Sequence, residues 1–254
     1  MTRISGKKIV ITGASSGIGK NIALEVAKQG GVPILLARRT DKLEELVAQI
    51  EKSANVKAYC FKLDISDEQE IATVFASIYE EIGEIDVLIN NAGFLLLKNA
   101  DEATQTEVKE LFSVNVFGLI ECTKAVLVNM KKKNAGQIVN IASINGKLPV
   151  SGASAYVASK HAVLGFTNAL RLEMLKTNVQ ITTINLGPVN TELFEKATGA
   201  SEQSNNVKKL DPEIVAQKVV ATIGTNKREL NLPGFLGFLG KCYAFIPGLM
   251  EKLS

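Results

Sequence analysis

The stretch Thr12-Gly13-Ala14-Ser15-Ser16-Gly17-Ile18-Gly19 decides the fold, because it joins an apolar run at 7–12 to a helical pattern at 17–30. Glycine lets the backbone turn tightly and approach a pyrophosphate, while the helix N-terminus presents free N–H groups to that anion. A strand, this glycine spacing and a helix in succession are typical of a dinucleotide-binding turn. The turn residues that we expect at the dinucleotide are Gly13, Ser15, Ser16, Gly17, Ile18 and Gly19.

Apolar runs and helical patterns alternate along most of the chain. The predicted strands are 7–12, 33–37, 56–61, 86–90, 137–142 and 179–185, and the predicted helices are 17–30, 41–53, 67–82, 104–133 and 154–176. Continuous apolar strands of this length suit a sheet that is covered on both faces. The βαβ order therefore predicts an α/β fold, a Rossmann-type doubly wound parallel sheet flanked by helices in a single domain.

The composition excludes several classes of function. With 46% hydrophobic and 22% charged residues and a net charge of +3, the chain resembles ordinary globular proteins and gives no argument for a nucleic-acid partner. The three cysteines form no C-x-x-C pair and His161 is the only histidine, so we expect no disulfide framework and no metal site. No signal-peptide segment precedes Lys7, and we expect a cytoplasmic protein.

The C-terminal residues are more apolar than the rest of the chain. We predict a dinucleotide-binding and catalytic domain at 1–229 and an apolar extension at 230–254 that packs on the domain or on a partner. Its uncharged pieces, 230–240 and 242–250, are shorter than the roughly 20 apolar residues of a membrane span. We expect the extension to cover the substrate pocket or to meet another subunit, with peripheral membrane contact as the alternative.

A tyrosine and a lysine supply proton chemistry. Tyr156 and Lys160 are four residues apart and therefore share one helix face. A nearby ammonium favours the phenolate and moves the tyrosine pKa down from its usual value of about 10. Ser143 follows a predicted strand and can donate a hydrogen bond to a developing alkoxide. Together with the glycine turn, these residues predict hydride transfer between a nicotinamide and a carbonyl or alcohol.

Two arginines follow the second predicted strand. An NAD-binding protein usually places an acidic residue there to bind the ribose hydroxyls, whereas this chain has Ala37, Arg38 and Arg39. An arginine at this place can pair with a 2′-phosphate, which favours NADP(H) as the cofactor. The alternative is that both arginines lie in a solvated loop.

The same glycine turn also matches a G-x-S-x-G nucleophile elbow at 13–17, which would indicate a serine hydrolase. The elbow needs an oxyanion loop from an earlier strand and a histidine further along the chain. No earlier strand is predicted, and His161 directly follows Lys160 on the same helix. The hydrolase is therefore disfavoured.

The chain resembles the short-chain dehydrogenase/reductase family, in its compact single-domain branch. The resemblance covers residues 7–191 and rests on the glycine turn, Asp64, Asn90-Asn91-Ala92-Gly93, Asn115, Ser143, and Tyr156 with Lys160. It implies that Tyr156 is the general acid in reduction and the base in oxidation, while Ser143 orients the carbonyl. It further implies that Lys160 binds the nicotinamide ribose and lowers the tyrosine pKa, and that Asn115 holds a water in a proton relay.

The resemblance also implies most of the remaining cofactor contacts. Asp64 and Ile65 would contact adenine, and Thr191 would contact the carboxamide. The other residues expected at the cofactor are Arg38, Arg39, Asn91, Ala92, Gly93, Tyr156, Lys160, Gly187, Pro188 and Val189. Leu186 departs from the family, which usually has a proline at that position.

These observations predict an NADP-dependent oxidoreductase that acts on a CH–OH or C=O group and forms a homodimer or homotetramer. The alternatives are an isomerase or dehydratase that uses a bound nucleotide, and a catalytically silent NADP-binding sensor or scaffold. We expect residues 94–97, 148–150 and 193–194 to line or roof the pocket. Because these segments are apolar, the expected substrate is an apolar small molecule.

Overall fold

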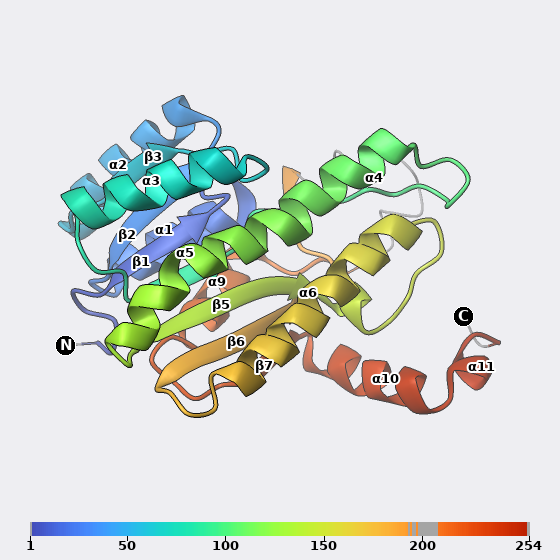
Figure 1. Cartoon of the computed structure of the whole chain (residues 1–254). Helices are drawn as coiled ribbons and strands as arrows, with labels where there is room; N and C mark the ends of the chain where they lie inside the picture. The colour runs from blue at the N-terminus through green and yellow to red at the C-terminus, as the bar shows by residue number, and fades with distance from the viewer. Residues whose placement is uncertain (1, 193, 195–196, 198–207, 253–254) are drawn as a thin grey trace.

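A seven-stranded parallel sheet organises the chain, in a computed structural model that describes residues 2–192, 194, 197 and 208–252 (Figure 1). The strand order is β3-β2-β1-β4-β5-β6-β7, with parallel pairing throughout. The strands are β1 (Lys8–Thr12), β2 (Val32–Ala37), β3 (Tyr59–Lys62), β4 (Val87–Asn90), β5 (Gly136–Ser143), β6 (Val179–Leu186) and β7 (Glu229–Leu232). The predicted Rossmann-type doubly wound α/β fold is confirmed.

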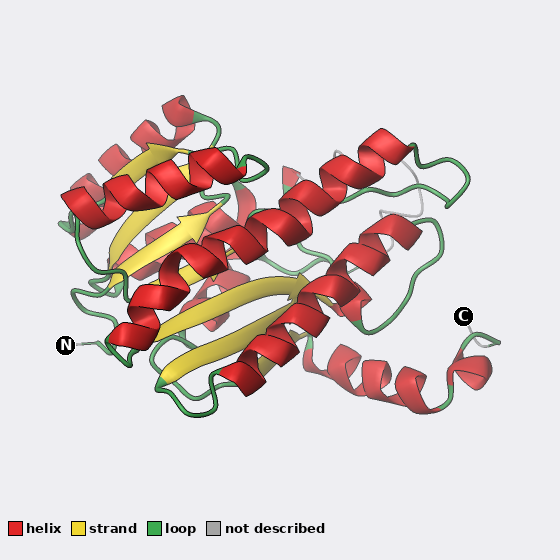
Figure 2. Cartoon of the chain, viewed as in Figure 1, coloured by secondary structure: helices red, strands yellow, loops and turns green. Residues whose placement is uncertain are grey.

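Helices cover both faces of the sheet (Figure 2). Alternate residues of β1 point to opposite faces, so Ile9 packs with the layer of α1, α2 and α9, and Val10 packs with the layer of α3, α5 and α6. The helices are α1 (Gly17–Lys28), α2 (Thr40–Ala54), α3 (Glu68–Glu81), α4 (Gln105–Phe112), α5 (Leu119–Lys132), α6 (Ser154–Glu173), α9 (Pro212–Val220), α10 (Gly234–Phe245) and α11 (Pro247–Met250).

The helix predicted at 104–133 is not a single α-helix. A π-helical segment, η1 (Ser113–Gly118), separates α4 from α5. Asn115 lies in this segment and hydrogen-bonds with the backbone of Phe94, while Gly118 packs against Ile65. The wider π-turn therefore accommodates two tertiary contacts, which a pattern of hydrophobic residues does not reveal. Segments of this kind often occur at functional sites.

The combined helix over residues 105–132 is apolar enough to be compared with a membrane span. Its 28 residues include a window with a mean hydropathy of 1.7, of which 44% is buried inside the protein. Core helices of soluble proteins pass the same test of length and composition. The helix therefore gives no argument for a membrane span.

The helix α9 and the strand β7, which both belong to the main body of the molecule, were absent from the predicted set. The helix α9 begins at Pro212 after the N-cap Asp211, whose carboxylate accepts a hydrogen bond from the Glu213 N–H at 2.7 Å. This N-cap followed by proline is a start signal that the sequence does contain. The strand β7 has only four residues of mixed polarity, so its pattern is too short to identify. Because β7 spans the predicted boundary at 229, the sheet continues into the first residues of the predicted extension.

The extension after β7 forms α10 and α11, which project from the body of the molecule (Figure 1). The face of α10 that meets the body carries glycines: Gly237 packs on Asn231 of β7, and Gly240 packs on Lys147. The phenylalanines point the other way, and Phe235 and Phe238 are 63% and 68% exposed. The helix therefore docks through its smallest residues and presents its largest apolar ones to the surroundings.

Candidate active site

The carboxyl ends of the strands meet at one edge of the sheet and bring the predicted residues together. In the strand order, β1 lies between β2 and β4, so the connections lead away from β1 in opposite directions. Such a reversal leaves a crevice in which open α/β sheets bind ligands. The glycine turn, Asn91 and Ser143 lie at the ends of β1, β4 and β5, beside this crevice.

The glycine turn is packed directly on the loop that follows β4. Gly13 has a φ of +66°, and a Cβ added there would lie 2.8 Å from the Cα of Ala92. Asn91 donates a hydrogen bond from Nδ2 to the Thr12 carbonyl at 2.9 Å, and the backbone N–H groups of Asn91 and Ala92 donate to the Thr12 hydroxyl. Glycine is therefore required at residue 13 both by the backbone conformation and by the close approach.

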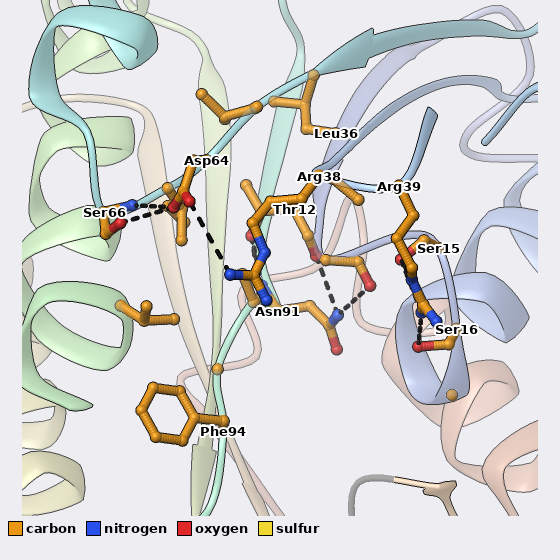
Figure 3. Close-up of a pocket in the computed structure, with 18 of the residues that line it drawn as sticks. Thr12, Ser15, Ser16, Leu36, Arg38, Arg39, Asp64, Ser66, Asn91 and Phe94 are labelled. Carbon is orange, nitrogen blue, oxygen red and sulfur yellow. Dashed lines mark hydrogen bonds and ion pairs between the residues drawn. The ribbon is translucent and has the colours of Figure 1, made fainter. Parts of the chain in front are cut away.

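A groove of about 990 Å³ begins at this turn and passes between the ends of β2 and β3 (Figure 3). It is large enough for the adenosine half of a dinucleotide and more. The predicted cofactor residues that line it are Gly13, Ser15, Ser16, Gly17, Ile18, Arg38, Arg39, Asp64, Ile65, Asn91, Ala92, Gly93 and Thr191. Gly19 does not line the groove, because it faces the Gly13 carbonyl and the Asn91 side chain.

The two arginines at the end of β2 have different partners (Figure 3). The guanidinium of Arg39 donates to the hydroxyls of Ser15 at 3.0 Å and Ser16 at 2.8 Å, so it lies over the glycine turn. Arg38 instead lies 3.9 Å from a carboxylate oxygen of Asp64. Both arginine side chains are exposed at the rim of the groove. Two cationic groups therefore border the region where a ribose phosphate would lie.

Asp64 is held in place by the residue two positions after it. Ser66 donates to Oδ1 of Asp64 from its backbone N–H at 3.0 Å and from its hydroxyl at 2.6 Å. Burial by itself would raise the pKa of Asp64, but these hydrogen bonds and the charge of Arg38 outweigh it and hold the pKa below its usual value. Asp64 is therefore an ionised, oriented acceptor in the groove.

A second cavity, of about 160 Å³, lies next to the groove and contains Ser143 and Tyr156. The nearby Ser143 hydroxyl favours the phenolate, but burial is the larger influence and raises the pKa of Tyr156. The lowered tyrosine pKa expected from the Lys160 ammonium is thus not found in the cofactor-free chain. The Ser143 oxygen also accepts the Asn145 N–H at 3.1 Å and donates to the Leu186 carbonyl at 3.3 Å.

Lys160 is a buried ammonium without a protein partner in the described part of the chain. It is 7% exposed, and its Nζ lies 5.7 Å from the centre of the Tyr156 ring. Burial lowers its pKa to about 8. The groups nearest to Nζ include Gly93, where an added Cβ would lie 3.6 Å away. A buried cation is costly unless it is hydrogen-bonded, so this site fits a ligand that carries hydroxyl groups.

Asn115 ties the loop after β4 to the helix that carries the catalytic pair. Its Oδ1 accepts the Phe94 N–H at 2.9 Å, and its Nδ2 donates to the Phe94 carbonyl at 3.0 Å and to the Ser159 hydroxyl at 3.3 Å. Ser159 in turn donates to the Tyr156 carbonyl at 2.7 Å. Asn115 therefore fixes the geometry of the cavity. Its expected role in holding a water stays a prediction.

The predicted pocket lining is correct in part. Phe94, Leu95 and Phe194 line the catalytic cavity, together with Ile18, Asn91, Gly93, Gly187, Pro188, Val189 and Thr191. The predicted segment at 148–150 does not line it, and Val150 is 48% exposed because this loop leads away from the cavity toward α6. The residues at 96–97 also lie outside the lining, and Leu193 lies outside the described residues.

The sequence does not by itself indicate the four lining residues that flank Ser143, namely Ile141, Ala142, Ile144 and Asn145. Their closeness to Ser143 in sequence was the available signal. The unusual Leu186 is also explained: it is the last residue of β6, it pairs with Leu232 of β7, and its carbonyl accepts the Ser143 hydroxyl. Leucine therefore continues the strand up to the catalytic serine.

Two further observations concern the surroundings of the site. Among the described residues, no group of three or more His, Cys, Asp or Glu side chains could hold a metal ion. The described residues that line the catalytic cavity include none from α10 or α11. Leu236 of α10 nevertheless lies against Gly187, which does line the cavity, since a Cβ added at Gly187 would be 3.1 Å from the Leu236 side chain. That the extension covers the substrate pocket stays a prediction.

A glycine turn, a groove rimmed by arginines and a tyrosine–lysine pair together define an oxidoreductase that uses a dinucleotide. The family model described as short chain dehydrogenase matches residues 7–202, and the chain therefore belongs to that family.

Its relatives are similar over most of their length. The NADP-dependent 3-hydroxy acid dehydrogenase of Schizosaccharomyces pombe is 38% identical, over 87% of this chain and 88% of the relative. The farnesol dehydrogenase of Aedes aegypti is 35% identical, over 90% of this chain and 94% of the relative. A short-chain dehydrogenase from Sphingobium yanoikuyae in complex with NADPH has a TM-score of 0.85 and 25% identity, over 96% and 95% of the two chains.

Proposed function

We propose that this protein is an NADP-dependent oxidoreductase that reduces a ketone or aldehyde, or oxidises the matching alcohol. The observation that carries the proposal is that Tyr156, Ser143 and the buried Lys160 ammonium, which lies 5.7 Å from the centre of the Tyr156 ring, line one cavity. A proton donor, an orienting hydroxyl and a buried cation are the groups that carbonyl reduction requires beside a hydride source.

The residues of the chain divide the proton chemistry among them. NADP(H), when bound, supplies or accepts the hydride. In reduction the Tyr156 hydroxyl gives its proton to the carbonyl oxygen, where the electron pair of the C=O π bond forms the new O–H bond. The hydride brings the electron pair of the new C–H bond. The Ser143 hydroxyl orients that oxygen, and the Lys160 ammonium stabilises the phenolate that remains on Tyr156. In oxidation the phenolate takes the hydroxyl proton.

Three features of the chain support NADP(H) as the cofactor. The Lys160 ammonium has no hydrogen bond to a described residue, and ribose hydroxyls would supply partners. The glycine turn approaches the Asn91 loop so closely that a Cβ at Gly13 has no room. Arg38 and Arg39 rim the groove where the second ribose would lie, and charge-assisted hydrogen bonds from guanidinium to phosphate are strong. The NADP-dependent yeast relative and the NADPH-bound bacterial structure agree with this assignment.

The substrate that we propose is a small molecule with an apolar portion. Phe94, Leu95, Ile144, Val189 and Phe194 supply most of the apolar surface of the catalytic cavity. The named substrates of the relatives differ widely, since one is a 3-hydroxy acid dehydrogenase and another a farnesol dehydrogenase. Fold and family thus leave the choice to the residues that line this cavity.

We further propose a cytoplasmic homodimer or homotetramer. Several large apolar side chains are more than half exposed on the described surface, among them Phe117, Leu172 and Leu175 of the α5–α6 side and Phe235 and Phe238 of α10. Exposed apolar surface of this kind is typical of a subunit interface. Sizing of the purified chain by light scattering tests the assembly, and a monomer at working concentration would contradict it.

The oxidoreductase proposal is tested by mixing the protein and NADPH with a panel of ketones, aldehydes and quinones. We expect the near-ultraviolet absorbance of NADPH to fall with at least one carbonyl compound and to stay constant without it. Tight NADPH binding with no turnover across the panel, in either direction, would instead favour a silent nucleotide sensor.

A further inference from the structure

The polar groups of the catalytic cavity are nearly all accounted for by partners or by the proposed chemistry. Ser143 binds the backbone of Leu186 and Asn145, Asn91 binds the glycine turn, Tyr156 is the proposed proton donor, and Lys160 lies where ribose hydroxyls are expected. The exception is the side chain of Asn145. This residue lines the cavity, and its side-chain amide makes no hydrogen bond to any residue that the structure describes.

A side-chain amide without a partner can still form several hydrogen bonds. A primary amide offers two N–H donors and an oxygen acceptor with two lone pairs. Asn145 is half-buried, and neither polar atom of its side chain is among the fully buried atoms that lack a partner, so both remain accessible from outside the protein interior. A polar group of a ligand in the cavity can therefore reach it as well.

The position of Asn145 is fixed by its neighbours on both sides. It is the middle residue of the 3-10 turn η2 (Ile144–Gly146), and its backbone N–H donates to the Ser143 oxygen at 3.1 Å. Ile144 is buried, and a Cβ at Gly146 would lie 2.7 Å from the Leu164 side chain of α6. The turn is thus fixed against α6, and the backbone of Asn145 is held beside the Ser143 hydroxyl, which is proposed to orient the substrate oxygen.

We propose that Asn145 is a specificity-determining residue that hydrogen-bonds a second oxygen of the substrate, in a 1,3 relationship to the reacting oxygen. The proposal rests on the proposed oxidoreductase function and names its substrate class: 3-oxo acids and esters, and the corresponding 3-hydroxy compounds. The reacting oxygen binds at Ser143, and an oxygen on the carbon two positions away lies near enough to reach the adjacent amide. A distal oxygen at the end of a long chain does not.

The apolar surroundings make the Asn145 amide the group that discriminates between substrates. The other free surface of the cavity is apolar, from Phe94, Leu95, Ile144, Val189 and Phe194. A plain ketone fills the cavity but leaves the amide unpaired, and an unpaired polar group that loses its water is costly. A substrate with the second oxygen restores the hydrogen bond. Discrimination therefore comes from this pairing and not from the size of the cavity.

The test compares two substrates of equal chain length, ethyl acetoacetate and the corresponding plain methyl ketone, by NADPH consumption. We expect the wild-type enzyme to prefer the ester in kcat/KM. Asn145→Leu keeps the side chain near its original size and removes both donors and acceptor. We expect it to lower kcat/KM for the ester by about 3- to 10-fold, the range of a neutral hydrogen bond, and to leave the methyl ketone unchanged or improved.

Two further variants sharpen the result. Asn178→Leu makes the same substitution at an exposed residue at the opposite edge of the sheet, and we expect it to change neither substrate. Asn145→Asp keeps the shape and the acceptor but removes the donors and adds a charge. If the amide donates to the second oxygen, this variant loses ester reduction and discriminates most strongly against the acetoacetate anion.

The outcomes separate this proposal from the one on which it rests. Equal losses for ester and ketone in Asn145→Leu would make the residue merely structural and overturn the specificity role. Wild-type reduction of the plain ketone without preference for the ester would do the same, while the oxidoreductase function stands. The absence of NADPH-dependent turnover with every carbonyl compound would overturn the proposed function itself.

Discussion

Arg39 lies over the glycine turn, where its guanidinium is 3.0 Å from the hydroxyl of Ser15. Arg38, its neighbour in sequence, turns to Asp64 instead. One arginine is therefore joined to the phosphate-binding turn and the other to a predicted adenine contact. Both face the part of the groove in which the 2′-phosphate of NADP(H) would distinguish it from NAD(H).

The first prediction concerns cofactor choice. The double variant Ala37→Asp with Arg38→Leu adds an acceptor for ribose hydroxyls and removes a cation, so it should shift preference from NADPH toward NADH. Loss of a charged hydrogen bond corresponds to about 10- to 150-fold in affinity. Arg39→Leu alone should weaken NADPH more than NADH. Dissociation constants from cofactor fluorescence check both, and a wild-type enzyme that uses NADH equally well would contradict the assignment.

Tyr156→Phe should nearly abolish turnover while NADPH still binds. The substitution removes the proton that is transferred and keeps the ring that lies near the Lys160 ammonium. General acid–base catalysis contributes about 10²- to 10⁴-fold. Steady-state rates and a binding titration separate the two effects. A variant that keeps more than about a tenth of the wild-type rate would rule out Tyr156 as the acid.

Lys160→Met should make the cofactor-free protein more stable at neutral pH. The pKa of Lys160 falls from 10.5 to about 8 on burial, so the folded ammonium carries a penalty below pH 8. Between these two values the unfolded chain binds more protons, and wild-type stability therefore rises with pH. Met removes the penalty, so the variant gains up to about 3 kcal/mol at neutral pH. The gain should disappear as the pH approaches 10.5.

Denaturant unfolding of the cofactor-free proteins at several pH values measures this effect, and a pH-independent difference would contradict the buried-cation interpretation. The same variant should lose both catalytic rate and NADPH affinity, because one ammonium is proposed to serve both. Unchanged affinity together with an unchanged pH profile of the rate would show that Lys160 does not have this dual role.

Gly19→Ala should destabilise the fold and weaken NADPH binding together. A Cβ at this residue would meet the Gly13 carbonyl and lie 2.6 Å from Nδ2 of Asn91, so the turn must shift. Overpacking of this kind costs about 1–3 kcal/mol. Gly165→Ala is the matched control, since this exposed glycine of α6 has no atom within 4 Å of an added Cβ. Thermal melting should show a loss for the first and a small gain for the second.

Phe238→Ser should reduce the size of the assembly without lowering the stability of the single chain. Phe238 is 68% exposed on the outer side of α10, so it does not contribute to the core and is available to the proposed subunit contact. Truncation before Gly234 leaves β7 intact and should have the same effect on size. If sizing, melting and kinetics all stay unchanged, the subunit contact is wrong, and flotation of the full-length chain with liposomes then tests membrane binding.

The sequence predicts the frame of this molecule well, because the information is local. Long apolar strands, the glycine turn and Asp67, the N-cap of α3, are all recognisable within a few residues. The short β7 is different, because it becomes a strand only through its pairing with β6. The π-turn at Asn115 likewise depends on contacts with Phe94, which is 21 residues away in the chain.

The candidate site likewise combines residues that the sequence identifies with an environment that only the fold creates. Ser143, Tyr156 and Lys160 can be identified from their spacing, but their environment cannot. The raised pKa of Tyr156 follows from burial in the assembled cavity. The different partners of Arg38 and Arg39 follow from the position of β2 between β3, which Asp64 follows, and β1, which the glycine turn follows. Asn145 carries no motif at all, and only the cavity reveals its unpaired amide.

Asn115 grips Phe94 by its main chain alone, through the N–H and the carbonyl. These two hydrogen bonds therefore do not depend on which side chain stands at residue 94, although residue 94 lines the catalytic cavity. Mutations there can reshape what the enzyme accepts while the catalytic frame keeps its alignment. The residues that align the proton chemistry are thus separate from a side chain that shapes the substrate pocket. Residue 94 is therefore a natural starting point for changing substrate specificity by directed evolution.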